Sequence, residues 1–241
     1  LNFFQDTSQG ATVNWNPPFV ETSVTQNLSL APGSTMYLHT PGTAPLLTQG
    51  WGQVSAGQGV FAFAIYTYGG IAGRPDQDGT SPGVSAATRI LVPFDNTAGF
   101  ATSMAIVNPT ASAEIVSVNI QTDNGTITQT SLPSPLPANG QLAFTMAQQL
   151  PATAGRRGIA EFYVAAAGGG ISIAAFRFNP TIALTSIPVV FTGGNPIIGA
   201  TPPPNALPGK SFEGVVKTID SRVDPITRAV EVIAEVPNPD R

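Results

Sequence analysis

One pattern occurs twice in this chain: a set of short apolar segments, each beside a glycine, in the same order. Four glycines of the first set have counterparts 107 to 115 residues later, namely Gly10 with Gly125, Gly33 with Gly140, Gly50 with Gly158, and Gly59 with Gly170. The separation changes only where loops are expected. Loops accept insertions, whereas a one-residue slip turns over every side chain of a strand. The order therefore favours a duplicated β module over chance similarity among glycine-rich strands.

The second copy is complete and spans residues 87–191. Seven or eight short strands in roughly a hundred residues are typical of a β-sandwich. One helical turn is expected at 146–150, with Thr145 as its cap and Pro151 at its end. The strands are predicted near 88–93, 100–108, 114–121, 126–131, 141–145, 158–165, 170–178 and 185–191.

The first copy, residues 1–86, has no counterpart of residues 88–109, so we expect a truncated module. In the second copy that stretch reads RILVPFDNTAGFATSMAIVNP, two apolar runs around an acidic turn. Asp95 and Asn96 are expected to hydrogen-bond local backbone amides there. Strands are predicted in the first copy near 2–4, 11–13, 35–38, 50–54 and 59–65, with Trp51, Phe61 and Phe63 filling a core.

Composition agrees with many short strands. The 241 residues include 25 Gly and 23 Pro, which interrupt helices and form turns. Only 10% are charged, against about 25% in typical soluble domains, as is common for proteins that work outside the cytoplasm. The net charge of −4 argues against nucleic acid as a partner. The sequence contains no run of 18 apolar residues, which is the length that would predict a membrane-spanning helix.

Cysteine is absent, which excludes disulfides and thiolate sites but leaves the compartment open. The sequence starts at Leu1 with neither Met nor a signal-peptide pattern. We therefore expect a processed segment or a fragment.

The composition changes after residue 191. Residues 192–207 form a Gly/Pro-rich linker with polyproline character. Residues 208–241 then carry 11 of the 24 charged residues of the chain. This tail is predicted to form strands at 212–219 and 227–236 around a turn at 224–225.

Parts of residues 1–191 resemble repeat modules of uncharacterised secreted bacterial proteins of the kind common in acidobacteria. The resemblance rests on residues 92–102 and 105–109, a turn at 123–125 and an ending at 185–189. It implies an extracellular β-sandwich repeat and brings no agreed activity.

The tail resembles a different family. Residues 208–216, 219–230 and 236–240 are similar to the β-barrel domain of periplasmic adaptor subunits, the membrane fusion proteins (HlyD-like family) of RND-type efflux pumps. In that family the Asp-Pro-x-Thr-Arg stretch, here 224–228, turns one barrel strand into the next. The match covers about 34 residues, and the adaptor's lipoyl-like, hairpin and membrane-proximal domains have no counterpart here.

Catalytic candidates are few. His39 is the one histidine, and the stretch nearest to a nucleophile elbow, around Ser85, lacks the second glycine of that motif. We expect His39 to end the strand 35–38 rather than to act in catalysis. Asp76 and Asp78 are weak candidates for a calcium loop, but the later acidic ligands are missing. An exposed connector is the preferred interpretation of residues 74–83.

Aromatic side chains provide the remaining candidates. Trp15, Trp51 and Tyr66 are weak candidates for a carbohydrate-binding face, because flat rings stack on sugar rings. Core packing is the alternative, and Trp51 corresponds to Ile159 in the second copy, which favours it. The glycines at 168–170 are expected to form a hairpin turn rather than a phosphate cradle.

Together these observations predict an all-β fold of tandem antiparallel β-sandwich modules with a C-terminal partial β-barrel or β-hairpin segment. The domains are 1–86, 87–191, a linker at 192–207, and 208–241. The expected protein is non-catalytic, lacks cofactor and metal, and works in the extracellular space or cell envelope in display, adhesion or spacing. Its partner would be an unidentified surface protein or polysaccharide. The alternatives are a periplasmic fragment of an efflux adaptor, with efflux-pump components as partners, and a carbohydrate-binding module.

Overall fold

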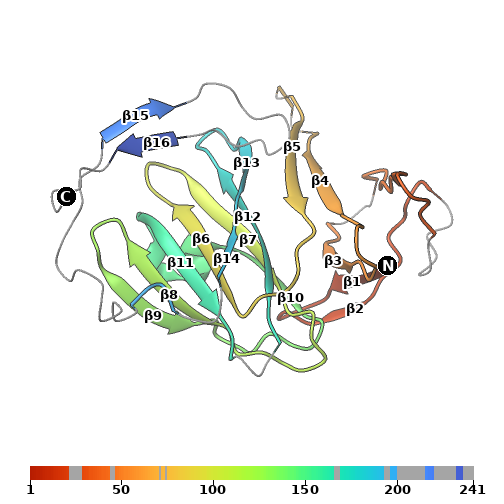
Figure 1. Cartoon of the computed structure of the whole chain (residues 1–241), viewed down its shortest axis with the longest axis horizontal. Helices are drawn as coiled ribbons and strands as arrows, with labels where there is room; N and C mark the ends of the chain where they lie inside the picture. The colour runs from red at the N-terminus through yellow and green to blue at the C-terminus, as the bar shows by residue number, and fades with distance from the viewer. Residues whose placement is uncertain are drawn as a thin grey trace. The chain divides into compact units, whose positions relative to one another are not determined.

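The computed structural model describes residues 1–21, 29–43, 47–70, 72–73, 75–165, 169–192 and 196–199, and the backbones of two further strands, Val215–Ile219 and Val232–Glu235. The chain is all-β with antiparallel pairing (Figure 1). Its contacts divide it into two units, Leu1–Ala200 and Thr201–Arg241. The division falls within the predicted linker 192–207.

Residues 87–191 form two antiparallel sheets. One has five strands in the order β14-β6-β11-β8-β9, and the other has four in the order β10-β7-β12-β13. Each predicted strand of this module is found within a few residues. The strands are β6 (Arg89–Asp95), β7 (Ala101–Val107), β8 (Ser117–Thr122), β9 (Ile127–Ser131), β10 (Gln141–Thr145), β11 (Arg157–Tyr163), β12 (Ser172–Phe178), β13 (Leu184–Ile187) and β14 (Val190–Phe191).

The core lies between these two sheets because their strands alternate buried and less buried side chains. β6 buries Ile90, Val92 and Phe94, and β7 buries Met104 and Ile106. Phe162 of β11 is fully buried among them. The alternation in the stretch that opens the module is therefore the pattern of a sandwich interior.

The helical turn α1 (Met146–Gln149) forms with Thr145 at its N-cap position, as predicted, but the Thr145 side chain makes no capping hydrogen bond; its Oγ1 lies 3.1 Å from Ser103 Oγ. One detail of the prediction was wrong. The single strand predicted at 185–191 is two strands, because the chain changes sheet at Pro188. β13 pairs with β12, whereas β14 pairs with β6.

Four turns of this module share an Asx-x-Thr pattern. In each, the Asx Oδ1 accepts the backbone N–H two residues later at 3.0–3.1 Å. Such a side chain closes a turn that the backbone alone leaves open. The expected local role of Asp95 is thereby confirmed. The four pairs are Asp95 with Thr97, Asn108 with Thr110, Asn124 with Thr126, and Asn179 with Thr181.

The first copy contains half of the same architecture. Its strands are β1 (Asn2–Asp6), β2 (Thr12–Asn14), β3 (Gly50–Gln53), β4 (Phe63–Tyr68) and β5 (Gln77–Pro82). The order β2-β1-β3 repeats the order β9-β8-β11 of the second copy, and the hairpin β4-β5 repeats β12-β13. Within the described residues, nothing pairs as β6 and β7 do.

A close backbone approach marks the equivalence of the two copies. A Cβ on Gly50 would lie 2.0 Å from the Phe4 carbonyl oxygen, and a Cβ on Gly158 would lie 2.1 Å from that of Gln121. Glycine is thus required at the same place in both three-stranded units. The backbone hydrogen bond beside this glycine is also found in both copies. The Asp6 N–H donates to Gln49 O at 2.9 Å in the first copy, and the Asp123 N–H donates to Arg157 O at 3.0 Å in the second.

The strand predicted at 35–38 does not form. Its counterpart in the second copy is β10, which pairs with β7 along Gln141–Thr145. Among the described residues of the first copy no strand takes the place of β7, so nothing described there pairs with this segment. A strand needs a neighbour to satisfy its backbone groups, whatever its own pattern.

The second unit is described by two strands alone. β15 (Val215–Ile219) pairs antiparallel with β16 (Val232–Glu235), with a bulge between Val216 and Thr218. Both lie inside the predicted strands 212–219 and 227–236. The turn at 224–225 and the proline run 202–204 lie outside the described residues. Across the described chain, no helix has the length and hydropathy needed to cross a membrane.

Candidate functional site

The two catalytic candidates occupy exposed positions in the first copy. His39 N–H donates to Glu21 Oε2 at 2.8 Å, and the His39 ring pairs with the same carboxylate. That backbone hydrogen bond is the main cause of the lowered pKa of Glu21. Ser85 is exposed in the segment that follows β5. His39 therefore links two loops rather than ending a strand.

Part of the connector predicted at 74–83 is instead the strand β5 (Gln77–Pro82), while Asp76 lies in the connection directly before it. Asp78 belongs to β5, where it pairs with Thr67 of β4, and its Oδ1 accepts the Thr67 hydroxyl at 2.8 Å. Asp76 Oδ1 accepts the Gly70 N–H at 3.3 Å. Residues 77–82 form a strand because they pair with β4 as the second arm of a hairpin. In the described part of the chain, no three His, Asp or Glu side chains gather as a metal site would need.

The three candidate sugar-binding rings each have a different neighbour. Trp51 is half-buried, stacks on Phe4 at 4.6 Å between ring centroids, and donates its Nε1–H to Asn139 O at 2.9 Å. Tyr66 meets the Phe176 ring edge-on at 5.5 Å, and burial raises its pKa. Trp51 and Tyr66 thus serve contacts between the two copies.

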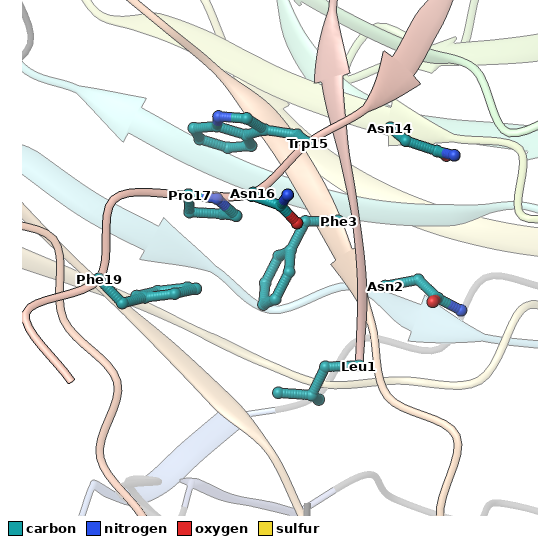
Figure 2. A pocket seen from close by; sticks show the side chains of 8 residues that line it. All are labelled: Leu1, Asn2, Phe3, Asn14, Trp15, Asn16, Pro17 and Phe19. Atoms are coloured by element: carbon teal, nitrogen blue, oxygen red, sulfur yellow. The ribbon is translucent and has the colours of Figure 1, made fainter. Parts of the chain in front are cut away.

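Trp15 lies on the wall of a small pocket at the start of β1. Figure 2 shows the Phe19 ring pointing toward Phe3, with Trp15 beside Pro17. The two Phe rings are 5.2 Å apart. The pocket volume is about 70 Å³, well below the roughly 300 Å³ at which small-molecule sites begin. This recess accommodates a methyl group or a few waters rather than a sugar ring.

Among the described residues, β4 and the residue two positions before it carry three large, well-exposed apolar side chains. Phe61, Phe63 and Ile65 are 83%, 75% and 60% exposed. Phe63 and Ile65 are two residues apart in β4 and so share one face of the strand; together with Phe61, just before the strand, we call them the β4 apolar face. The expectation that Phe61 and Phe63 fill a core was wrong, because the strands that cover the equivalent position in the second copy have no counterpart here.

Sequence reasoning missed a buried carboxylate. Glu161 of β11 is fully buried. It accepts hydrogen bonds from Asn119 Nδ2 at 3.0 Å and the Ile197 N–H at 2.8 Å, and its Oε1 lies 3.3 Å from Arg89 Nη1. Arg89 also lies 4.4 Å over the Tyr163 ring. Through the Ile197 N–H, this cluster holds residues 196–199 against the five-stranded sheet.

A second charged group joins the two sheets. Asp95, at the end of β6, forms an ion pair with Arg177 of β12 at 2.6 Å, and the guanidinium lies 3.7 Å over the Phe100 ring. Burial on its own would raise the pKa of Asp95, but hydrogen bonds from Thr97 and Arg177 outweigh it and lower that pKa. The corner between β6 and β7 is therefore held by charge as well as by its turn.

This lowered pKa predicts an acid-sensitive contribution to stability. A carboxylate of depressed pKa stabilises the fold above its unfolded pKa, near 3.8, and the contribution is lost as the pH falls through the folded value. We expect Asp95→Asn to cost about 1–2 kcal/mol at pH 7, where a charged hydrogen bond is lost. Urea unfolding should show that difference unchanged at pH 5 and much reduced at pH 2.5. A difference independent of pH would contradict the assignment.

Comparisons with protein-family models, curated proteins and solved structures found no match to this chain.

Proposed function

We propose that the chain is a non-catalytic protein of tandem β-sandwich modules that works in the extracellular space or the cell envelope, in display, adhesion or spacing. Modular β-sandwiches of this kind carry binding surfaces on loops and edges, while their cores supply rigidity. The proposal starts from the strand orders that the two copies share, β2-β1-β3 with β9-β8-β11 and β4-β5 with β12-β13. The low charge content, 10% of residues, and the resemblance to secreted repeat modules support the location.

The observation that carries the proposal is the contact between the two copies. The turn around Asn139 accepts hydrogen bonds from Trp51 Nε1 at 2.9 Å and Thr12 Oγ1 at 2.7 Å through one carbonyl oxygen. Next to it, the Gln141 N–H donates to Gly10 O at 3.0 Å. Both copies thus contribute backbone and side-chain groups to one junction.

A second junction connects β5 with β13. The Thr80 N–H donates to Ser186 Oγ at 2.8 Å, and the Ser186 hydroxyl donates to Thr80 O at 2.7 Å. The Leu184 N–H donates to Gln77 Oε1 at 2.7 Å. Two modules joined at two places hold their surfaces in a fixed relation, which suits display of a binding surface.

The proposal is tested by binding of the purified chain to cell-envelope fractions and to a panel of insoluble polysaccharides. We expect saturable retention on at least one fraction, competed by soluble material from that fraction. Loss of retention in Trp15→Ala, with retention kept in Tyr37→Ala, would identify the carbohydrate-binding version. Tyr37 is the control because it is an aromatic residue of the first copy whose side chain is 73% exposed and lies outside the pocket that Trp15 lines.

Two results would overturn the proposal. One is the absence of retention on every fraction. The other is hydrolysis of any panel substrate that is lost in Ser85→Ala or His39→Ala, since these are the candidate nucleophile and base.

The efflux-adaptor alternative is a second candidate, favoured by the antiparallel pairing of β15 with β16 in the segment that resembles an adaptor barrel. It predicts that the whole natural chain co-purifies with an RND-type transporter after crosslinking in cells. It also predicts that deletion of its gene raises sensitivity to dyes and detergents. Wild-type resistance in the deletion strain would count against this candidate.

A further inference from the structure

We propose that Asn124 is a site of spontaneous chemical modification, at which the backbone nitrogen of Gly125 converts the side-chain amide to a carboxylate without an enzyme. The site lies in the exposed turn that joins β8 to β9 (Figure 1). The co-reactant is water, and the product released is ammonia. The inference concerns a modification site and does not depend on the proposed function.

The reaction needs an amide side chain that is followed by a residue with a backbone N–H. The Gly125 nitrogen attacks Cγ of Asn124 and forms a C–N bond, while its proton passes to hydroxide or water. Oδ1 then carries the negative charge until the bond to Nδ2 breaks, and Nδ2 takes up a proton from water and leaves as ammonia. Water finally opens the cyclic imide at either carbonyl group, which gives aspartate or isoaspartate.

Two hydrogen-bond donors are directed at the oxygen on which this charge develops. The Thr122 hydroxyl donates to Asn124 Oδ1 at 2.6 Å, and the Thr126 N–H donates to the same atom at 3.1 Å. The hydroxyl also lies 3.2 Å from Thr126 O, but its contact with Oδ1 is the shorter one. Donors at a developing oxyanion stabilise the transition state more than the neutral amide.

Each of the other three Asx-x-Thr turns lacks one reactant. In those of Asn108 and Asn179 the next residue is proline, whose nitrogen has no hydrogen to give up. In the third turn, Asp95 carries a carboxylate paired with Arg177, and a group that is already negative resists attack by a nucleophile. Of the four turns, the one at residue 124 therefore combines an amide, a following N–H and two donors.

A second Asn-Gly pair in the sequence, Asn139-Gly140, provides an internal comparison. The Gly125 N–H donates to Thr122 O at 2.9 Å, and the Gly140 N–H donates to Pro137 O at 2.9 Å. The cost of freeing the attacking nitrogen is therefore similar at the two sites. They differ at the amide oxygen, because no donor from the described part of the chain contacts Asn139 Oδ1.

The two sites also differ in the space around them. The backbone of Asn139 has a φ of +54°, and its carbonyl oxygen accepts two hydrogen bonds at the junction between the copies. Gly140 is buried, and a Cβ there would lie 2.4 Å from Gly10 O. A Cβ on Gly125 would have no neighbour within 4 Å. The turn at Asn124 thus has room to close the cyclic imide, whereas packing opposes that change at Asn139.

The two products change the turn in different ways. Aspartate at position 124 keeps an acceptor for the Thr126 N–H and adds a negative charge beside Asp123, which pairs with Arg157 at 2.7 Å. Isoaspartate inserts one further carbon into the backbone. It therefore works against the hydrogen bond from the Thr122 N–H to Thr126 O, 3.0 Å long, that closes the hairpin.

The test incubates the purified whole chain in weakly alkaline buffer and follows both Asn-Gly sites by peptide mapping with mass spectrometry. We expect conversion at Asn124 at a rate that rises with pH. Conversion at Asn139 should be roughly tenfold slower or more, the rate equivalent of two hydrogen bonds. Chromatography against synthetic aspartate and isoaspartate peptides separates the products. In urea, where the fold is lost, the two sites should convert at similar rates.

The matched variants are Thr122→Val and Thr126→Ala. Thr122→Val removes the hydroxyl and keeps the branched shape of a residue that is 8% exposed. We expect it to slow conversion at Asn124 roughly two- to tenfold, the rate equivalent of one hydrogen bond. Thr126→Ala keeps the backbone N–H that donates to Oδ1 and should leave the rate unchanged.

Four outcomes would overturn the proposal. They are no conversion at Asn124, equal rates at the two sites in the folded chain, a rate difference that persists in urea, and an unchanged rate in folded Thr122→Val. The first three are measured on the natural sequence, so they decide the matter even where circular dichroism shows that Thr122→Val does not fold.

Discussion

Glu161→Ala is expected to lower the free energy of unfolding by about 3–5 kcal/mol, the range found when one partner of a buried ion pair is removed. The fully buried carboxylate accepts two hydrogen bonds, from Asn119 Nδ2 and the Ile197 N–H, and faces the Arg89 guanidinium. Alanine would leave Arg89, whose side chain is 13% exposed, without its carboxylate. It would also leave a space beneath residues 196–199.

The measurement is guanidinium unfolding at pH 7, followed by far-UV circular dichroism. Asp123→Ala is the matched control, because Asp123 also pairs with an arginine, Arg157, at 2.7 Å, but both side chains are about half exposed. Such exposed pairs contribute about 0–1 kcal/mol. Glu161→Gln keeps the shape and should fall between the two. Equal losses for Glu161→Ala and Asp123→Ala would contradict the role of burial.

Asn108→Ala is expected to cost about 2–4 kcal/mol, because each buried polar group left without its partner costs about 1–3 kcal/mol. The side chain is fully buried just after β7. Its Nδ2 donates to the carbonyl oxygens of Ser112, Leu136 and Pro137 at 2.7–3.0 Å. Its Oδ1 accepts from the Thr110 N–H and hydroxyl. One amide thus closes the turn 108–112 and ties it to residues 136–137.

The matched control is Asn124→Ala in the same Asx-x-Thr pattern. Asn124 is exposed, and its Oδ1 accepts only from Thr126 and the Thr122 hydroxyl. Its loss should cost less than about 1 kcal/mol, as typical exposed hydrogen bonds do. Asn108→Asp, which keeps the acceptor and removes the donor, should lose most of the Asn108→Ala amount. A cost for Asn108→Ala no larger than for Asn124→Ala would show that the pattern, rather than the burial, sets the effect.

The second copy could be predicted almost strand by strand, and the reason is physical. Its strands alternate buried and less buried side chains, as Ile90, Val92 and Phe94 show in β6, and turn residues separate the strands. Pattern and pairing agree there because every strand has its neighbour. The change of sheet at Pro188 was missed, because alternation shows which side chains face inward and does not show which sheet a strand joins.

The first copy could not be predicted to the same depth. Residues 35–38 have the sequence pattern of a strand but form no strand. Phe61 and Phe63 are large apolar residues of the kind found in a core, but they are exposed. In both cases, among the described residues, no strand from another part of the sequence pairs with or covers the segment. Local pattern predicts what a segment can form, while long-range pairing decides what it does form.

The buried carboxylate was missed for a related reason. Glu161 alternates with Ala160 and Phe162, so the pattern places it on the outer face of β11, where solvent is the default expectation. Residues 196–199 cover that face, and Ile198 is only 3% exposed. A single acidic residue within an apolar strand of a chain with few charges is the one signal that could have indicated a special role.

The pairing of β14 with β6 sets how the second module would respond to a pulling force. Phe191 lies opposite Ile90, and the Thr192 N–H donates to Arg89 O at 3.2 Å, so the first and last strands of the module end side by side. A force applied to the chain before β6 and after β14 would load these hydrogen bonds one after another, in the zipper geometry, rather than all at once. The two-residue strand β14 would detach first, while the paired sheets behind it stay closed. Such a module is expected to yield locally at its C-terminal strand before its two sheets separate.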